Sequence, residues 1–194
     1  MTIGSLFSSH RVAELQVTVC TDVDFSTIDS IEVVSTQLPM GLFVALAYNG
    51  AFFEAAFASN LAEYLLQMQQ TYTNARFTVN NPHLQSIVKS LFEPEKYSLV
   101  PNITMLLSGT SFQLKVWNEL LTIPFGQTMS YDDIAIKLGD KKASRAVGTA
   151  IGQNKIAYLV PCHRVVAKNG KLSNFKWGIE CKRQLLNWEM EQVY

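Results

Sequence analysis

Residues 156–166 read IAYLVPCHRVV, and this stretch decides how the C-terminal part of the chain is interpreted. Its five leading apolar residues predict a buried, strand-like segment. Pro161 restricts the backbone to an extended turn, so Cys162 is expected where that segment opens into a site. A thiol beside the imidazole of His163 and near the guanidinium of Arg164 is in surroundings that lower a thiol pKa. Taken alone, however, a Cys-His pair favours a plain buried cysteine beside a hydrogen-bonded histidine, with a reactive cysteine as the alternative.

Two short helices joined by a glycine turn precede this stretch. Ser130 is expected to cap a helix that packs through Ile134, Ile136 and Leu138, and a turn at Gly139 leads into a second helix over 143–152. The second helix is expected to carry Ala146, Val147, Ala150 and Ile151 on one side. The basic residues Lys141, Lys142 and Arg145 gather at its start, where a helix-turn-helix meets phosphates and bases. They favour nucleic-acid binding over simple helix packing.

Charge is distributed unevenly along the 194 residues, although 16 basic and 16 acidic side chains balance overall. Residues 1–108 carry a net charge of −5 and residues 109–194 a net charge of +5. Apolar residues make up 48% of the chain, three cysteines cannot build a disulfide framework, and no signal peptide or membrane-spanning stretch is recognisable. We therefore expect no membrane association and a reducing compartment, with a polyanion as a candidate partner of the second part.

The pattern before residue 109 predicts an α/β domain over residues 1–108. A strand is expected over 12–20, and Asn49-Gly50 predicts a hairpin between 42–48 and 51–58. Helices are expected from Leu61 to about 72 and after Pro82, followed by a strand over 102–107. A further helix, capped by Thr110 or Ser111, begins the second domain and is expected to pack through Phe112, Val116, Trp117, Leu120 and Leu121. His10, His83 and Cys20 are scattered, so no metal site is expected.

The segment Pro161–Val166 resembles the active-site motif of the O6-alkylguanine-DNA alkyltransferases, the methylated-DNA–protein-cysteine methyltransferases. The resemblance continues over 103–194, whereas residues 1–102 resemble the family's N-terminal domain only in size and element order. It implies an α+β two-domain fold, with a ribonuclease-H-like α/β domain over 1–108. It also implies a winged-helix-like helical domain over 109–194, which carries the helix-turn-helix and the cysteine loop. The other matching residues are Thr110–Gln113, Ile123–Gly126, Ser130-Tyr131, Ser144–Gly148, Gln153–Lys155, Trp177-Gly178, Lys182, Leu185-Leu186 and Glu189.

The resemblance implies direct DNA repair by a single displacement. An alkyl group moves from O6 of guanine to Cys162, each molecule acts once, and no cofactor is needed. His163 deprotonates Cys162 through a water, Glu189 orients His163, and Tyr131 donates to the leaving guanine. The sequence does not decide whether larger alkyl groups or O4-alkylthymine are also substrates.

The resemblance further implies a monomer that binds double-stranded DNA and flips out the target nucleotide. Arg145 is expected to fill the vacated space, and Asn154 to tie the helix-turn-helix to the cysteine loop. Trp177 is typical of bacterial members, which implies a bacterial source and a cytoplasmic location. The other expected DNA contacts are Ser130, Lys141, Lys142, Ala146 and Arg164, and the expected pocket residues are Tyr131, Val165, Phe175, Lys176 and Trp177.

Other classes of protein share parts of this pattern. An alkyltransferase-like protein recognises a lesion without transfer, but such proteins lack the reactive cysteine that Cys162 supplies here. A winged-helix transcription factor would explain the charge and the two helices, but not the residues around Cys162. A cysteine hydrolase would need an oxyanion hole, for which the sequence has no motif.

Overall fold

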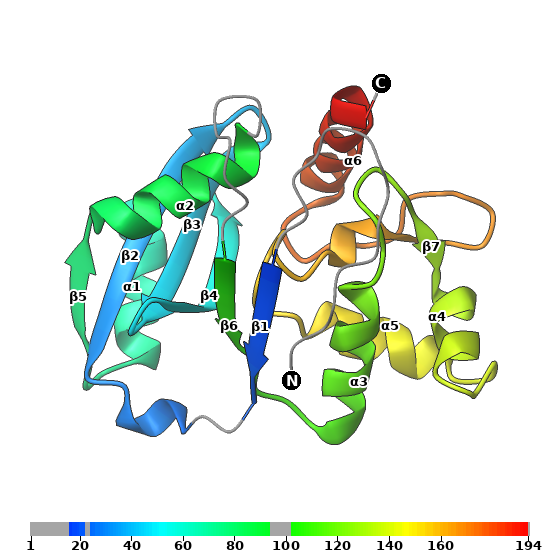
Figure 1. The fold of residues 1–194 in the computed structure, drawn as a ribbon, viewed down its shortest axis with the longest axis horizontal. Coiled ribbons are helices and arrows are strands. Elements are labelled where there is room, and N and C mark those ends of the chain that lie inside the picture. The colour runs from blue at the N-terminus through cyan, green and yellow to red at the C-terminus, as the bar shows by residue number, and fades with distance from the viewer. Residues whose placement is uncertain (1–15, 22–23, 94–101, 194) are drawn as a thin grey trace. The chain divides into compact units, whose positions relative to one another are not determined.

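The N-terminal unit is built around a six-stranded mixed sheet (Figure 1). In the computed structural model, which describes residues 16–21, 24–93 and 102–193, the strand order is β1-β6-β4-β3-β2-β5. Strands β2, β3 and β4 are successively antiparallel, whereas β5 is parallel to β2, and β6 is parallel to both β1 and β4. The chain divides into two compact units, 1–108 and 109–194. The strands are β1 (Gln16–Cys20), β2 (Ser30–Leu38), β3 (Gly41–Tyr48), β4 (Ala51–Ala58), β5 (Arg76–Val79) and β6 (Asn102–Leu106).

The hairpin predicted at Asn49-Gly50 is confirmed. It joins β3 to β4, and both turn residues have positive φ, 50° for Asn49 and 78° for Gly50. Only residues that tolerate the left-handed region can occupy both positions of such a turn. The strand expected over 12–20 is observed as β1, and residues 12–15 lie outside the described residues.

Two helices pack on opposite faces of this sheet (Figure 1). Helix α1 (Leu61–Thr71) begins at Asn60, whose side chain accepts from two backbone N–H groups, and its Met68 packs in the core with Ile31 and Val33. Helix α2 (Pro82–Phe92) covers the other face, where its Phe92 ring lies edge-on to Phe43. Both helices were predicted from capping and periodicity, and both are confirmed.

Strands β2 and β5 were not predicted. Strand β2 is buried on both faces at Val33 and Val34, so its sequence shows no clean alternation. Strand β5 has only four residues and is exposed along most of its length. Their pairing with each other is therefore not visible in the local pattern.

The C-terminal unit consists of helices α3 (Ser111–Leu120), α4 (Tyr131–Lys137), α5 (Ser144–Gly152) and α6 (Ile179–Val193). Thr110 caps α3 and Ser130 caps α4, each through a reciprocal capping box, as the sequence predicts. Three residues predicted to pack inside are instead on the surface: Phe112 is 38% exposed and Ile136 is 59% exposed, and Ala146 is exposed on α5. These three helices are short, so their buried stripes are narrower than the sequence pattern suggests.

The segment predicted as a buried strand, 156–160, is buried but is not a strand. Backbone hydrogen bonds from Leu159 N to Ala157 O and from Val160 N to Ile156 O fold it into successive turns, and Tyr158 has a φ of 66°. The apolar run therefore reflects burial alone, since periodicity cannot distinguish a strand from a compact turn.

A two-stranded parallel sheet joins the start of α4 to the residues that follow Cys162. Its strands are β7 (Met129–Ser130) and β8 (Val165–Val166). This pairing holds the helix-turn-helix against the cysteine segment. Within the described residues, no helix has the length and apolar character that a bilayer crossing requires.

Candidate active site

Cys162 is the first residue of a short 3-10 turn, Cys162–Arg164, between Pro161 and β8. It is buried, with 4% of its surface exposed. The Asn154 side chain donates from Nδ2 to the Cys162 sulfur at 3.2 Å and to the carbonyl oxygens of Ile156 and Val160 at 3.1 Å each. Its Oδ1 accepts from the Ile156 N–H at 2.9 Å. Asn154 lies two residues after the end of α5 and is 2% exposed, so it ties the end of α5 to the cysteine turn and is not on the surface.

Glu189 of α6 is the centre of a buried polar cluster. Its carboxylate accepts from His163 Nε2 at 2.7 Å, from Arg164 Nε and Nη2 at 2.9–3.1 Å, and from the Gly126 N–H at 3.0 Å. Gly126 has a φ of 73°, and a Cβ there would lie 2.8 Å from Val193, so glycine is required at this donor. The Glu189 carboxylate thus accepts these hydrogen bonds from the cysteine turn and from Gly126, which lies in the loop before α4.

The protonation state of His163 follows from these partners. Burial lowers the pKa of His163, although the Glu189 carboxylate opposes this shift, so the imidazole is neutral at rest. Burial alone would raise the pKa of Glu189, but the hydrogen bond from His163 and the charge and hydrogen bonds of Arg164 outweigh it and lower that pKa to about 2. The permanent cation beside Glu189 is therefore Arg164. Since Nε2 faces the carboxylate, we assign the proton to Nε2, which leaves a lone pair on the buried Nδ1, an atom without a hydrogen-bond partner among the described residues.

The expectation of a low thiol pKa is wrong for the protein without DNA. Burial raises the pKa of Cys162 to about 11, and the hydrogen bond from Asn154 and the charge of Lys182 only partly offset it. Arg164 lies two residues after Cys162 in sequence, but its guanidinium is directed at Glu189. The resting pair is thus a protonated thiol and a neutral imidazole.

The Tyr131 hydroxyl belongs to a second, partly buried chain of hydrogen bonds. It lies 2.6 Å from Ser173 Oγ, which accepts from Lys182 Nζ at 3.1 Å. Lys182 also donates to the Val165 carbonyl oxygen at 2.5 Å. Burial lowers the pKa of Lys182 to about 8. Tyr131, at the start of α4, is thereby linked to an ammonium group on α6.

The expected pocket residues Phe175 and Trp177 lie in the loop before α6. Their rings are in contact, with centroids 5.1 Å apart and planes at 67°. Lys176 places its ammonium 5.4 Å from the Trp177 ring and donates to the Asn154 carbonyl oxygen at 3.4 Å. Val165 is fully buried in β8. Phe175, Lys176 and Trp177 thus form one cluster. Lys176 connects this cluster by a hydrogen bond to Asn154, which holds the cysteine.

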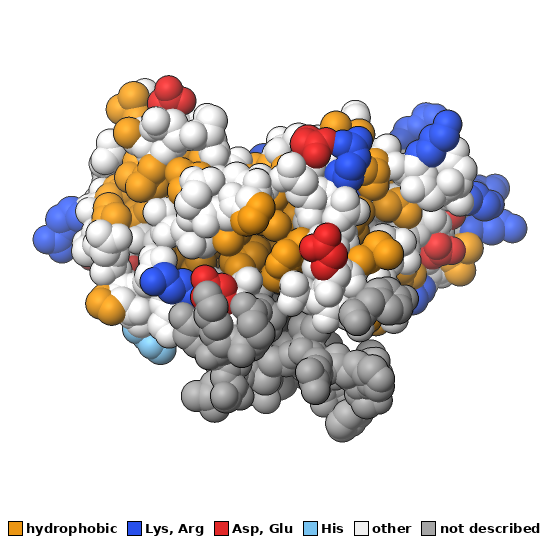
Figure 2. Space-filling view, turned by 90° about the horizontal axis from the view of Figure 1, so that it is seen from above, with side chains coloured by type: hydrophobic (Ala, Val, Ile, Leu, Met, Phe, Trp, Pro, Cys, Tyr) orange, Lys and Arg blue, Asp and Glu red, His pale blue; other side chains and the backbone are white. Residues whose placement is uncertain are grey.

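The cations predicted to meet DNA are exposed. Lys141, Lys142 and Arg145 lie at the turn and first residues of α5, and no ion-pair partner occurs for them in the part of the chain that the structure describes. Ala146 is exposed beside Arg145, and Ser144 Oγ donates to Asp132 of α4, which fixes the two helices together. Figure 2 shows lysine and arginine side chains gathered over the C-terminal unit, as its net charge of +5 requires.

The structure does not support three of the predicted DNA contacts, Asn154, Arg164 and Ser130, and Asn154 is only 2% exposed, as described above. Arg164 is buried, with its guanidinium bound to Glu189 and to the Ile123 carbonyl oxygen at 2.7 Å and stacked over Phe125. Ser130 is 8% exposed, and its hydroxyl is engaged with Asp133 in the α4 capping box. The side chains of Arg164 and Ser130 are therefore buried and hydrogen-bonded within the protein.

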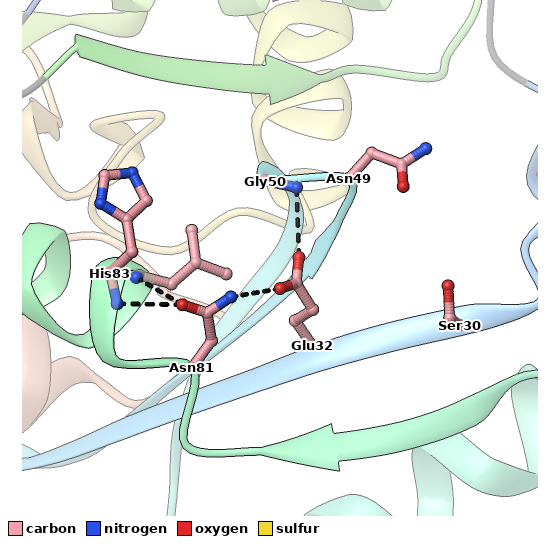
Figure 3. Close-up of a pocket in the computed structure, with 7 residues that line it drawn as sticks. Ser30, Glu32, Asn49, Gly50, Asn81 and His83 are labelled. Carbon is pink, nitrogen blue, oxygen red and sulfur yellow. Dashed lines mark hydrogen bonds between the residues drawn. The ribbon is translucent and has the colours of Figure 1, made fainter.

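A surface hollow of about 460 Å³ lies in the N-terminal unit (Figure 3). The Glu32 carboxylate in it accepts from the Gly50 N–H and from the Asn81 amide, and Asn81 in turn caps α2. The polar groups of Glu32, Gly50 and Asn81 are thus hydrogen-bonded to one another. We therefore interpret the hollow as the place where β2, the β3–β4 turn and the start of α2 are joined.

Sequence reasoning gave no role to three residues that the structure places in the site, Tyr158, Ser173 and Lys182. Lys182 could have been found, because Lys182, Leu185 and Glu189 recur at helical spacing on the buried side of α6. A lysine and a glutamate within an apolar stripe require buried partners. Ser173 and Tyr158 lie in irregular segments, where no periodicity indicates direction.

The site thus combines a buried cysteine held by Asn154, an imidazole oriented by a carboxylate, and exposed basic residues at the start of α5. Residues 111–191 match the family model described as the 6-O-methylguanine DNA methyltransferase DNA-binding domain. A probable methylated-DNA–protein-cysteine methyltransferase of Acanthamoeba polyphaga mimivirus is 39% identical over 138 residues, which cover 69% of this chain and 92% of the relative. The chain belongs to the methylated-DNA–protein-cysteine methyltransferase family.

Other relatives match over different lengths. The Saccharomyces cerevisiae methyltransferase is 53% identical over 85 residues, covering 44% of this chain and 45% of that protein. The chain thus spans less than half the length of the yeast relatives it matches. The OGT protein of Mycobacterium tuberculosis, solved in complex with DNA, has a TM-score of 0.66 and 30% identity, covering 84% of this chain and 94% of that one. The family and the α+β fold are therefore shown.

Proposed function

We propose that this protein repairs DNA directly by moving an alkyl group from O6 of guanine to the sulfur of Cys162. The observation that carries the proposal is the arrangement of Cys162, His163 and Glu189, in which a buried thiol is next in sequence to a buried, neutral imidazole that a carboxylate orients. Family membership supports it. A protein that only recognises lesions would have no use for a buried thiol in this arrangement.

In the proposed reaction, the Cys162 proton passes to His163 Nδ1, with a water as the relay that the family resemblance implies. The sulfur electron pair forms the S–C bond to the alkyl carbon, and the C–O6 bond breaks with its electrons on guanine. Tyr131, connected through Ser173 to Lys182, donates a proton to the guanine anion. The thioether is stable, so each molecule acts once and no cofactor takes part.

The substrate is proposed to be double-stranded DNA with the alkylated nucleotide flipped out, since the target atom is inside the duplex. The exposed Arg145 on α5 fits the residue that fills the vacated space, and Lys141 and Lys142 fit phosphate contacts. The DNA complex of the M. tuberculosis relative supports this choice of partner.

The finer description of the fold belongs to the same proposal. The antiparallel β2-β3-β4 meander followed by the parallel β5 supports a ribonuclease-H-like domain over 1–108. The α4–α5 pair supports a winged-helix-like, helix-turn-helix domain over 109–194. The proposal also includes a monomeric protein and, because Trp177 is typical of bacterial members of the family, a location in the bacterial cytoplasm.

The test is the intact mass of the protein after incubation with duplex DNA that contains O6-methylguanine. We expect the wild-type chain to gain one methyl group, located on Cys162 by peptide mapping. Cys162→Ser should gain none yet still bind the DNA, because an alcohol is not ionised near neutral pH. Cys181→Ser and Cys20→Ser are the matched controls and should gain one methyl group. A wild-type protein that binds the lesion with unchanged mass would instead support lesion recognition without transfer.

A further inference from the structure

Tyr158 has a backbone conformation that aromatic residues rarely adopt. Its φ is 66°, in the left-handed region. The other non-glycine residues with positive φ in the described ranges are Asn49 and Asn80, and asparagine enters this region far more readily. Such a conformation persists only where the surroundings hold it, and it is found most often at functional sites.

The Tyr158 ring is held against the proposed base. It stacks on the His163 imidazole with the centroids 5.7 Å apart and the planes at 10°. Its edge meets Trp188 of α6, with centroids 6.1 Å apart, and Trp188 directly precedes Glu189 in the chain. Tyr158 is 5% exposed, and burial raises the pKa of its hydroxyl, so the ring is neutral. His163 is therefore fixed by a carboxylate at Nε2 and by an aromatic face.

In the proposed transfer, His163 has to accept a proton although its surroundings disfavour the imidazolium form. Burial and the charges of Arg164 and Lys182 disfavour the imidazolium, whereas the Glu189 carboxylate favours it. An aromatic face within about 6 Å of a cation stabilises the cation, and the Tyr158 ring lies at that range. The titratable or charged groups around the imidazole are Glu189 and Lys182 from α6, Arg164 and Cys162 from the 3-10 turn, and Tyr158.

We infer that Tyr158 is a positioning residue for the transfer proposed above, on which this inference rests. Its ring fixes the plane of His163 and stabilises the imidazolium formed when the Cys162 thiol loses its proton. The proton leaves the sulfur and arrives at Nδ1, and the electron pair left on the sulfur forms the new S–C bond. The strained backbone is what brings the ring over the imidazole.

The first measurement uses the DNA-free protein and compares Tyr158→Leu with Tyr158→Phe. Leucine removes the aromatic face, whereas phenylalanine keeps it and serves as the matched control. Nitrogen NMR of the imidazoles follows protonation on acidification, and His163 is identified among the three histidines of the chain by elimination. We expect protonation of His163 to begin about one pH unit lower in Tyr158→Leu than in Tyr158→Phe.

The second measurement is the rate of methyl transfer as a function of pH. At neutral pH, Tyr158→Leu should be about tenfold slower than wild type, and Tyr158→Phe within about twofold of it. The difference should shrink as the pH rises toward the pKa of the thiol, because hydroxide then removes the thiol proton and no imidazolium is needed. A purely structural effect would slow the reaction equally at every pH.

A third variant separates the ring from the backbone strain. Tyr158→Gly removes the ring but is relaxed at positive φ, so it tests the proposal even where Tyr158→Leu fails to fold. It should be as slow as Tyr158→Leu at neutral pH. Folded ring-less variants with the wild-type onset of protonation and a constant rate ratio would overturn the proposal, as would a Tyr158→Phe protein as slow as Tyr158→Leu. A wild-type protein that does not methylate Cys162 contradicts the proposed function, and the NMR comparison then decides alone on Tyr158.

Discussion

Asn154 Nδ2 lies 3.2 Å from the sulfur of Cys162 and 3.1 Å from the carbonyl oxygens of Ile156 and Val160. Two N–H groups therefore serve three acceptors, and one of the three is the proposed nucleophile. The amide fixes the sulfur relative to the end of α5. It also provides a hydrogen bond that grows stronger as the thiol becomes a thiolate.

Asn154→Asp tests this relationship, because it keeps the shape and removes the donor. The acceptor for the Ile156 N–H remains, but a carboxylate oxygen would face two carbonyl oxygens and a sulfur in a buried site. We expect the free energy of unfolding to fall by roughly 2–5 kcal/mol and methyl transfer to be lost. Urea unfolding and the mass assay measure both effects. Asn169→Asp is the control, since its exposed Oδ1 accepts from the Lys171 N–H in the same way. Equal stability of the two variants would contradict a tether at Asn154.

Acid should destabilise the C-terminal unit through Glu189 and His163. The folded pKa of Glu189 is lowered from 4.5 to about 2, so its stabilisation is complete above pH 4.5 and is lost as the pH falls through 2. The folded pKa of His163 lies below 6.5, so protonation of its unfolded form already reduces stability as the pH falls below 6.5. Glu189→Gln should cost about 3 kcal/mol at neutral pH, because Arg164 loses its counter-charge, and it should flatten the acid part of the curve.

Urea unfolding at a series of pH values measures this prediction. Glu191→Gln, exposed on the same helix, is the control and should follow wild type. An acid dependence that is the same in Glu189→Gln and wild type would assign the acid sensitivity to other carboxyl groups.

Local signals and distant contacts account for what the sequence could and could not predict. Ser130 was recognised as a cap because its capping box is complete within four residues, whereas the sequence left the cap of α3 open between Thr110 and Ser111 and the structure shows Thr110. Arg164 was misassigned because its acceptors, Glu189 and the Ile123 carbonyl oxygen, are distant in sequence. The thiol pKa was misjudged because burial, the largest cause of its rise, is not visible in the local sequence, and because the Arg164 guanidinium, two residues further on, is directed at Glu189.

Arg145→Ala should slow repair in duplex DNA more than reaction with the free base O6-methylguanine. The side chain is exposed on α5, so its removal leaves the core intact and affects only the cost of holding the nucleotide outside the helix, a few kcal/mol. Rates on both substrates, compared with Lys155→Ala as a second exposed cation of this unit, measure the effect. Equal slowing on both substrates would reduce Arg145 to a phosphate contact or a structural residue.

Trp177→Gly should widen the pocket for bulky alkyl groups. The indole contacts Phe175 and lies beneath the Lys176 ammonium, in the loop linked to Asn154. An indole fills space that a benzyl ring needs. We expect wild type to react poorly with O6-benzylguanine, and Trp177→Gly to gain much more rate on the benzyl than on the methyl substrate. Trp177→Phe should fall between them. A folded, methyl-competent Trp177→Gly protein with unchanged benzyl reactivity would show that the indole is not a pocket wall.

The burial of Cys162 has a consequence for the lifetime of the protein. A thiolate at the surface would react with any dissolved electrophile or oxidant, and a protein that transfers once would be inactivated before it met DNA. With 4% exposure and a pKa of about 11, the sulfur is both shielded and protonated. In the proposed single-transfer reaction, this burial would keep the sulfur unreacted between synthesis of the protein and its encounter with an alkylated base.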